Sequence, residues 1–139
     1  MANPIQNVLT GLHRLLYRAS GGRVGSRIAG LDVLLLTTTG SKSGQPRTTP
    51  LGFLRDGDAY VIVASNGGSD RHPAWYFNLR NDPRARLEIG GETFEVTAET
   101  MQGAERARVW SRVVQAGPGY AGYERRTSRE IPLVRLTRS

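Results

Sequence analysis

The sequence contains no cysteine, a single lysine and two histidines, and each scarcity excludes a class of site. Without cysteine the chain forms neither disulfides nor thiolate metal sites, and two isolated histidines, His13 and His72, do not make a metal centre. No apolar run approaches the roughly 20 residues that span a bilayer. Polar Asn3, Gln6 and Asn7 stand where a signal peptide would be basic and apolar, so we expect a cytoplasmic protein.

Positive charge is abundant and dispersed. The formal net charge is +7, which favours an anionic partner such as a phosphorylated or carboxylated cofactor, an acidic lipid or nucleic acid. A basic nucleic-acid-binding barrel is therefore one alternative, although the arginines form no continuous stripe and no nucleic-acid motif accompanies them. The single lysine is Lys42, which lies in the polar stretch 37–50.

The first 30 of the 139 residues differ in pattern from the remainder. Apolar residues at helical spacing, from Ile5 to Leu16, predict an amphipathic helix over 3–18, followed by a glycine-rich connector. Basic Arg14 and Arg18 lie off the apolar stripe. We expect such a helix to pack on the core or on a partner, and a helix on a membrane surface is the second interpretation. We expect residues 1–30 to be a separate segment preceding a domain over 31–139.

Strand-length segments dominate the second part of the chain. Glycine-bearing turns separate them, and they alternate with short helical stretches rather than in a repeated strand–helix order. The pattern predicts strands in 32–40, 46–57 and 58–68, a two-turn helix after Pro73, a hairpin turning at Gly90 and Gly91, a helix over 103–116 with Val109, Trp110, Val113 and Val114 toward the core, and a closing strand in 131–139. The fold class is mainly β with α, an antiparallel barrel with an N-terminal amphipathic helix and two further short helices.

Three segments carry residues suited to binding an anion or a heterocycle. Gly40 to Gly44 combines turn-forming glycines with Ser41, Lys42 and Ser43, and no acidic residue lies between 37 and 55. Taken alone, that loop is more typical of a solvated hairpin turn than of an anion site. Residues 64–78 lead from a strand into a helix with three consecutive aromatics, which cannot share one helix face. Residues 117–126 place two tyrosines in a flexible glycine-rich segment, which can fold over a pocket as a lid but is, taken alone, more typical of an ordinary surface loop.

Together these segments resemble the deazaflavin-dependent nitroreductase and quinone reductase family, whose members are split-β-barrel oxidoreductases that use reduced coenzyme F-420. The resemblance is densest in "LLLTTTGSKSGQPRTTPLGFLRDGDAYVIVASNGG" and "HPAWYFNL" and extends to "IPLVRL". It implies a split barrel of the flavin-reductase and pyridoxamine-phosphate-oxidase type, hydride transfer to a quinone, nitroaromatic or enone, and no metal. Small barrels of this sort often form homodimers.

The resemblance also assigns residues. The phosphate and acidic tail of the cofactor would be held by Ser41, Lys42, Ser43, Arg47, Thr48, Thr49, Pro50 and Leu51. The deazaflavin ring and its linker would be lined by Val63, Ala64, Ser65, Asn66, Ala74, Trp75, Tyr76, Phe77 and Asn78. Tyr120 and Tyr123 match tyrosines that close over the ring and face the substrate, and Ser65 matches a serine that hydrogen-bonds the substrate. These three are the expected catalytic residues.

Two positions depart from the family pattern. Nitroreductase-type members carry a tyrosine where this chain has Gly52 and another where it has Gly117. We expect the loss of two phenols to open the substrate side, which disfavours bulky bicyclic nitroimidazoles and favours quinones. A flavin mononucleotide oxidoreductase of the same fold is the alternative. If the acceptor is a membrane quinone, the basic amphipathic segment would contact the membrane peripherally.

Overall fold

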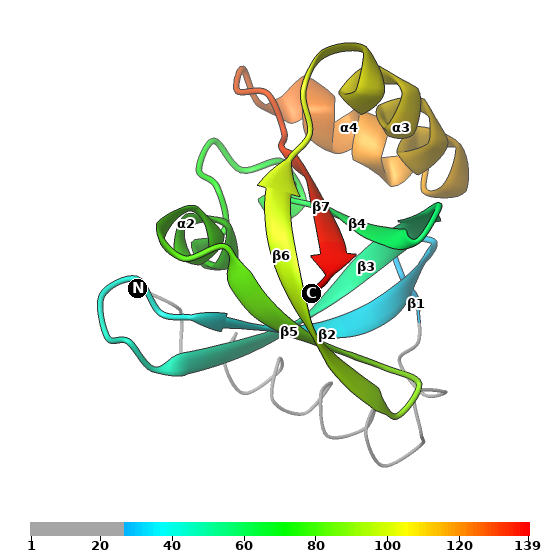
Figure 1. The fold of residues 1–139 in the computed structure, drawn as a ribbon. Coiled ribbons are helices and arrows are strands. Elements are labelled where there is room, and N and C mark those ends of the chain that lie inside the picture. The colour runs from blue at the N-terminus through cyan, green and yellow to red at the C-terminus, as the bar shows by residue number, and fades with distance from the viewer. Residues whose placement is uncertain (1–26) are drawn as a thin grey trace.

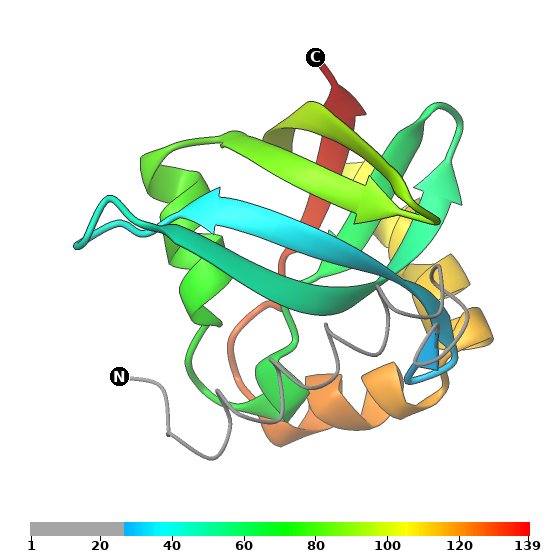
Figure 2. The same cartoon turned by 90° about the horizontal axis from the view of Figure 1, so that it is seen from below.

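The computed structural model describes residues 27–139. The helix predicted over 3–18, with Arg14 and Arg18, lies outside the described residues. Seven strands form one antiparallel sheet in the order β1-β2-β3-β4-β7-β6-β5, and β2 also pairs with β5. That last pairing closes β2 to β7 into a barrel, which Figure 1 shows from the side and Figure 2 from below. The antiparallel barrel predicted from the sequence is confirmed.

The elements follow the predicted segments closely. The strands are β1 Arg27–Ile28, β2 Leu31–Thr39, β3 Pro46–Asp56, β4 Ala59–Val63, β5 Arg84–Ile89, β6 Glu92–Thr100 and β7 Leu133–Arg138. The helices are the single 3-10 turn η1 Asn66–Gly68 and the α-helices α2 Ala74–Asn81, α3 Gly103–Ala116 and α4 Gly119–Arg126. The β5–β6 hairpin turns at Gly90 and Gly91, as predicted, and both glycines have positive φ.

Alternating side chains on the strands build two apolar cores. On β4, Ile62 points into the barrel, whereas Val61 and Val63 point outward against α3 and α4. Figure 1 shows these two helices covering the sheet at the β4 and β7 side, while α2 flanks the barrel elsewhere. Val109 and Val113 of α3 are fully buried in the outer core, as predicted. Trp110 is only partly buried and packs at the margin of that core.

One predicted element is wrong. The segment 117–126, expected to be a flexible loop, forms helix α4, so three α-helices follow β1 rather than two. The helix is held by packing, because Tyr120 is 4% exposed among the side chains of the outer core. A Cβ built on Gly68 would lie 3.0 Å from the Cα of Tyr123, so α4 rests directly on η1. Within residues 27–139, no helix is long and apolar enough to cross a membrane.

Candidate active site

The loop between β2 and β3 is a closed turn that exposes a lysine. The Gly40 N–H donates to the Gln45 carbonyl at 2.8 Å, and the Gly44 N–H donates to the Gly40 carbonyl at 2.9 Å. The Ser43 Oγ accepts from the Gln45 N–H at 3.1 Å, and a Cβ on Gly40 would lie 2.6 Å from that oxygen. Lys42 is exposed at the tip. The backbone hydrogen bonds therefore fix the loop without a ligand, and the Lys42 ammonium at its tip faces solvent.

A buried asparagine ties this loop to helix α2. The Ser41 N–H donates to the Asn78 Oδ1 at 3.0 Å, and the Asn78 Nδ2 donates to the Thr38 Oγ1 at 3.1 Å. Asn78 is 7% exposed and Thr38 is 2% exposed, so the hydrogen bond between them is buried, whereas the one from the exposed Ser41 is partly buried. The structure thus brings two sequence-predicted segments, 41–43 and 74–78, into contact through one side chain.

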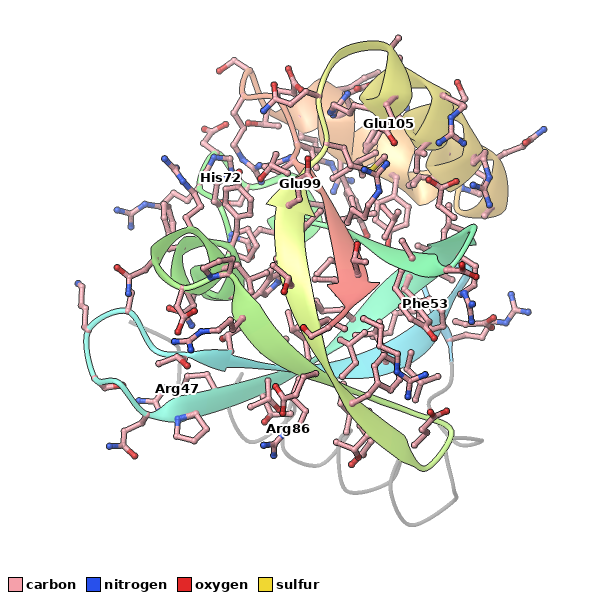
Figure 3. The ribbon with its side chains drawn as sticks, viewed as in Figure 1. Arg47, Phe53, His72, Arg86, Glu99 and Glu105 are labelled. Atoms are coloured by element: carbon pink, nitrogen blue, oxygen red, sulfur yellow. The ribbon has the colours of Figure 1, made fainter. Side chains whose placement is uncertain are left out.

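The β3 residues assigned to the same site do not all lie on one face. Thr49 pairs with Leu36 and Leu51 packs against the barrel core, so their side chains point toward the interior. Thr48 and Pro50 alternate with them and point to the opposite face, where the Thr48 hydroxyl lies 2.8 Å from that of Thr37. Arg47 stays near the loop, and its Nη2 donates to the Ser43 Oγ at 3.3 Å. Figure 3 shows Arg47 at the hairpin end of these strands.

The three aromatics of α2 divide as the helix geometry requires. Trp75 and Tyr76 are 6% and 7% exposed in the barrel core, whereas Phe77 is 46% exposed. Ala74 is also exposed, at the first turn of the helix. Phe77 is therefore the aromatic of this segment that a ligand can reach, and the other two serve packing.

The segment after β4 turns sharply beside α4. Val63 and Ala64 are buried, Ser65 is partly buried and Asn66 is exposed. Asn66, Gly67 and Gly68 all have positive φ, at 46°, 64° and 84°. Because Gly68 allows close approach of Tyr123, the structure brings the predicted wall 63–66 next to the tyrosine helix.

The two tyrosines of α4 differ in accessibility. Their rings meet edge to face with centroids 5.5 Å apart. Tyr120 packs in the outer core, where burial first and then the neighbouring Tyr123 raise the pKa of its phenol to about 12. Tyr123 is only partly buried. Tyr123 is therefore the more accessible hydrogen-bond donor, and Tyr120 keeps its proton at any physiological pH.

Gly52 and Gly117 do not leave open space. A Cβ on Gly117 would overlap the Ala29 carbonyl oxygen and lie 2.9 Å and 3.0 Å from carbons of the Tyr120 ring. A Cβ on Gly52 would lie 3.0 Å from the Leu31 Cβ. The turn between β1 and β2 fills both positions, so the expectation that the lost phenols open the substrate side was wrong.

Arg129 and His72 together hold the loop before α2. The sequence did not indicate that these two residues act as a pair. The Arg129 guanidinium donates to the backbone carbonyls of Ala64, Ser65 and Ser69 and contacts the His72 Nδ1 at 3.0 Å. Figure 3 shows His72 above α2, far from Arg47. Burial first, then Arg129 and Arg80, lower the pKa of His72.

Two clefts flank these segments. One of about 350 Å³ borders the β2–β3 loop and is lined by Thr37, Thr38, Thr39, Gly44, Pro46, Asp82, Arg84, Ala85, Arg86 and Glu95. Another of about 230 Å³ lies between α2 and the β6–β7 edge and includes Tyr76, Arg80 and Thr100. Neither lining includes Ser65, Tyr120 or Tyr123. The larger cleft extends the polar surface at the loop rather than the aromatic end of the site.

A family model described as F420H(2)-dependent quinone reductase matches residues 10–138. The chain belongs to this quinone reductase family. Membership confirms the expected oxidoreductase class and coenzyme F-420 as the cofactor.

Relatives and solved structures agree with the assignment. The F420H(2)-dependent quinone reductase Rv1261c of Mycobacterium tuberculosis H37Rv is 48% identical over 134 residues, 94% of this chain and 90% of its own length. The structure of the F420-H2 dependent reductase FDR-A is 39% identical with a TM-score of 0.69, covering 75% of this chain and 92% of its own. A structure described as a domain-swapped dimer is 36% identical with a TM-score of 0.71, covering 96% and 99% of the two chains.

The residues at the polar loop suit the cofactor of this quinone reductase family. The loop offers an exposed ammonium on Lys42, a hydroxyl on Ser43 and the guanidinium of Arg47, and no carboxylate stands between residues 37 and 55. These donors match a phosphate and carboxylate tail. The cradle also requires Gly40, because a Cβ there would strike Ser43.

Proposed function

We propose that this chain reduces quinones with reduced coenzyme F-420, whose anionic tail binds the loop around Lys42. The observation that carries the proposal is the Ser41–Asn78–Thr38 hydrogen-bond chain, which fixes the loop against helix α2. A cation-bearing loop and an aromatic helix are thereby held in one arrangement before any ligand arrives. Such preorganisation lowers the entropic cost of binding an elongated anionic cofactor.

The residues of the chain bind, orient and stabilise rather than form covalent intermediates. Reduced coenzyme F-420, when bound, supplies a hydride and thus two electrons at once. Lys42 and Arg47 bind the tail, and Ala64 to Asn66 with Phe77 line the ring. Tyr123 donates a hydrogen bond to the quinone oxygen as negative charge develops there, and a proton from this phenol or from water completes the hydroquinone. Ser65 supports the same oxygen, and Tyr120 orients Tyr123 through the edge-to-face contact.

A binding titration followed by turnover tests the proposal. We expect fluorescence titration to show binding of F-420, and the reduced cofactor to be oxidised when menadione is added. The Lys42→Ala variant should raise the Kd for F-420 about tenfold, because one charge-assisted contact is lost. Arg125→Ala removes a charge from an exposed position on α4 and is the matched control. Tight binding of flavin mononucleotide without binding of F-420 would contradict the proposal.

We also infer that the chain forms a homodimer. The 36% identical structure described as a domain-swapped dimer covers nearly all of both chains, and it supports a paired assembly in this fold. Light scattering coupled to size-exclusion chromatography measures the mass directly. A single species of 15.2 kDa at micromolar concentration would refute the inference.

We propose that the part of the segment 1–30 that precedes β1 is separate from the barrel domain, and that it contacts membranes peripherally from the cytoplasmic side; the barrel sheet itself begins at β1, Arg27–Ile28, which pairs with β2. The alternation of apolar and basic residues over 3–18 supports this proposal. Sedimentation with anionic liposomes at low salt tests it, with a variant lacking residues 1–26 as the control. Equal recovery of both proteins in the supernatant would refute it.

A further inference from the structure

We propose that Arg129 is a positioning residue for the cofactor site: its guanidinium holds the Ala64–His72 loop in the conformation that presents Ser65 and Asn66. The inference rests on the proposed function, because the contact between this loop and the deazaflavin ring is itself part of that proposal. Arg129 lies on the connection between α4 and β7, about 60 residues away from the loop in sequence, and its role is visible only in the folded chain.

The guanidinium makes four directed contacts with one short segment. Its Nε donates to the Ser69 carbonyl at 2.9 Å, and its Nη2 donates to the Ser65 carbonyl at 2.9 Å. Its Nη1 donates to the Ala64 carbonyl at 3.2 Å and contacts the His72 Nδ1 at 3.0 Å. Four of the five guanidinium N–H groups are therefore committed to a single loop. A lysine has one nitrogen and cannot reach acceptors spread over this span.

The loop needs an external clamp because its own backbone is in unusual conformations. Asn66, Gly67 and Gly68 are consecutive residues in the left-handed region. Internal support comes from the Gly68 N–H to the Ser65 carbonyl and the Ser69 N–H to the Asn66 carbonyl. Positive φ carries a cost only at Asn66, because glycine adopts it freely, and Arg129 bonds the Ser65 and Ser69 carbonyls on either side of this stretch. The Ser65 carbonyl accepts from both Gly68 and Arg129, so it is fixed from two sides.

Arg129 is itself fixed on the opposite side of the loop. Its backbone N–H donates to the Thr127 Oγ1 at 3.3 Å, and the Thr127 hydroxyl donates to the Asp70 Oδ1 at 2.9 Å. The Ala64 N–H donates to the Pro132 carbonyl at 2.9 Å. The segment 127–132 thus runs along the loop and is bonded to it at both ends. The clamp is rigid enough to transmit a change at Arg129 to the backbone of Ser65.

The contact with His72 makes the clamp sensitive to pH. A guanidinium only donates, so the His72 Nδ1 must be the acceptor and the imidazole must be neutral. The charged groups that face this ring are Arg129 from the α4–β7 connection and Arg80 from α2, whereas Asp70 of the loop acts on Arg129. Protonation of His72 removes the acceptor and places two cations in contact. Because the folded-state pKa of His72 is lowered from 6.5, the contact is intact at neutral pH and is lost only as the pH falls through that lowered pKa.

Hydrogen exchange without cofactor isolates the effect on the loop. We expect Arg129→Lys, which retains the charge, to increase amide exchange in peptides covering 64–72 at least tenfold while exchange in α3 is unchanged. Arg125→Ala is the control for loss of a nearby arginine. Unchanged exchange of the loop in Arg129→Lys would overturn the inference, whether or not the protein binds F-420. Absence of F-420 binding by the wild type would instead refute the proposed function.

Cofactor titration then tests the link to the site. Arg129→Ala should raise the Kd for F-420 about tenfold, and added guanidinium ion at non-denaturing concentration should restore part of the affinity, which a general loss of stability would not allow. His72→Phe keeps a ring against Tyr76 and Phe77 but cannot titrate. The ratio of the Kd of His72→Phe to the Kd of the wild type should fall as the pH is lowered from about 7.5 to 5, because only the wild type loses the His72 contact on acidification. Ionisation of the cofactor itself affects both proteins alike and cancels in the ratio. A ratio independent of pH, or a wild-type Kd in Arg129→Lys, would overturn the inference.

Discussion

Replacement of Gly117 by alanine is expected to destabilise the protein although the backbone there does not require glycine. Gly117 has φ −134° and ψ 88°, which an alanine adopts without strain. The added Cβ would overlap the Ala29 carbonyl oxygen and lie 2.9 Å from a carbon of the Tyr120 ring. The approach is reciprocal, because a Cβ on Gly30 would lie 2.6 Å from the Ala116 carbonyl oxygen. The neighbour that must move is therefore backbone rather than the end of a flexible side chain.

The size of the effect follows from two opposing contributions. Overpacking against fixed atoms costs about 1–3 kcal/mol, and the reduced entropy of the unfolded chain offsets about 0.4–1 kcal/mol of that. We expect a net loss of roughly 1–2 kcal/mol in the free energy of unfolding, with a decrease in Tm of a few degrees. Urea denaturation and calorimetry of the purified variant measure both quantities.

A second glycine of the same region supplies the control. Gly122 lies inside α4, and the nearest atom to a Cβ built there is the Arg125 Nη2 at 3.9 Å. Gly122→Ala should therefore stabilise the protein by about 0.5–1 kcal/mol through helix propensity. The reasoning fails if Gly117→Ala is as stable as the wild type, or if the two variants change stability in the same direction.

Three further predictions concern residues whose environments the structure defines. The hydrogen bond from Arg108 is the main reason that the pKa of Asp56 lies below its ordinary 3.8. The Asp56 carboxylate therefore stabilises the fold above about pH 4, and this stabilisation is lost as the pH falls. The difference in Tm between the wild type and Asp56→Asn should accordingly become smaller on acidification. Because the pKa of Tyr120 is raised from 10.0 to about 12, the neutral phenol contributes fully to the stability of the fold below pH 10.0, and this contribution is lost as the pH rises toward about 12. The Tm of Tyr120→Phe should therefore decrease less at alkaline pH than the Tm of the wild type. Asn78→Ala should cost about 1–3 kcal/mol in urea denaturation, because it leaves the buried Thr38 hydroxyl without its partner, and it should speed exchange of the Ser41 amide, which loses its acceptor.

The fold could be predicted largely because its signals are local. Strand alternation, the Gly90–Gly91 turn and the apolar spacing of α3 each act within a few residues, and each element appears where these patterns place it. Helix α4 was missed because Gly119 and Gly122 lower its helix propensity. Its stability comes from tertiary contacts, namely the burial of Tyr120 and the seating of Tyr123 on Gly68, which no window of sequence displays.

The site was predicted in part for a similar reason. The resemblance named the segments, but only the fold shows that Asn78 joins two of them and that Thr48 and Pro50 face away from Thr49. The sequence showed His72 only as an isolated histidine, because its partner Arg129 lies 57 positions away and is one of 18 arginines. An isolated histidine before proline gives no sign of such a partner.

Gly52 and Gly117 show why a missing side chain cannot be equated with empty space. The interpretation of two lost phenols as a wider substrate side assumed that the surroundings stay fixed. In the structure Ala29 of the β1–β2 turn lies against Gly117, and the flanking residues Ile28 and Leu31 lie against Gly52; Ala29 and Gly30 both have positive φ. Glycine at both positions is therefore what permits the turn to pack beside Tyr120. The space around Gly52 and Gly117 is therefore shaped by residues 28–31, which lie against both positions.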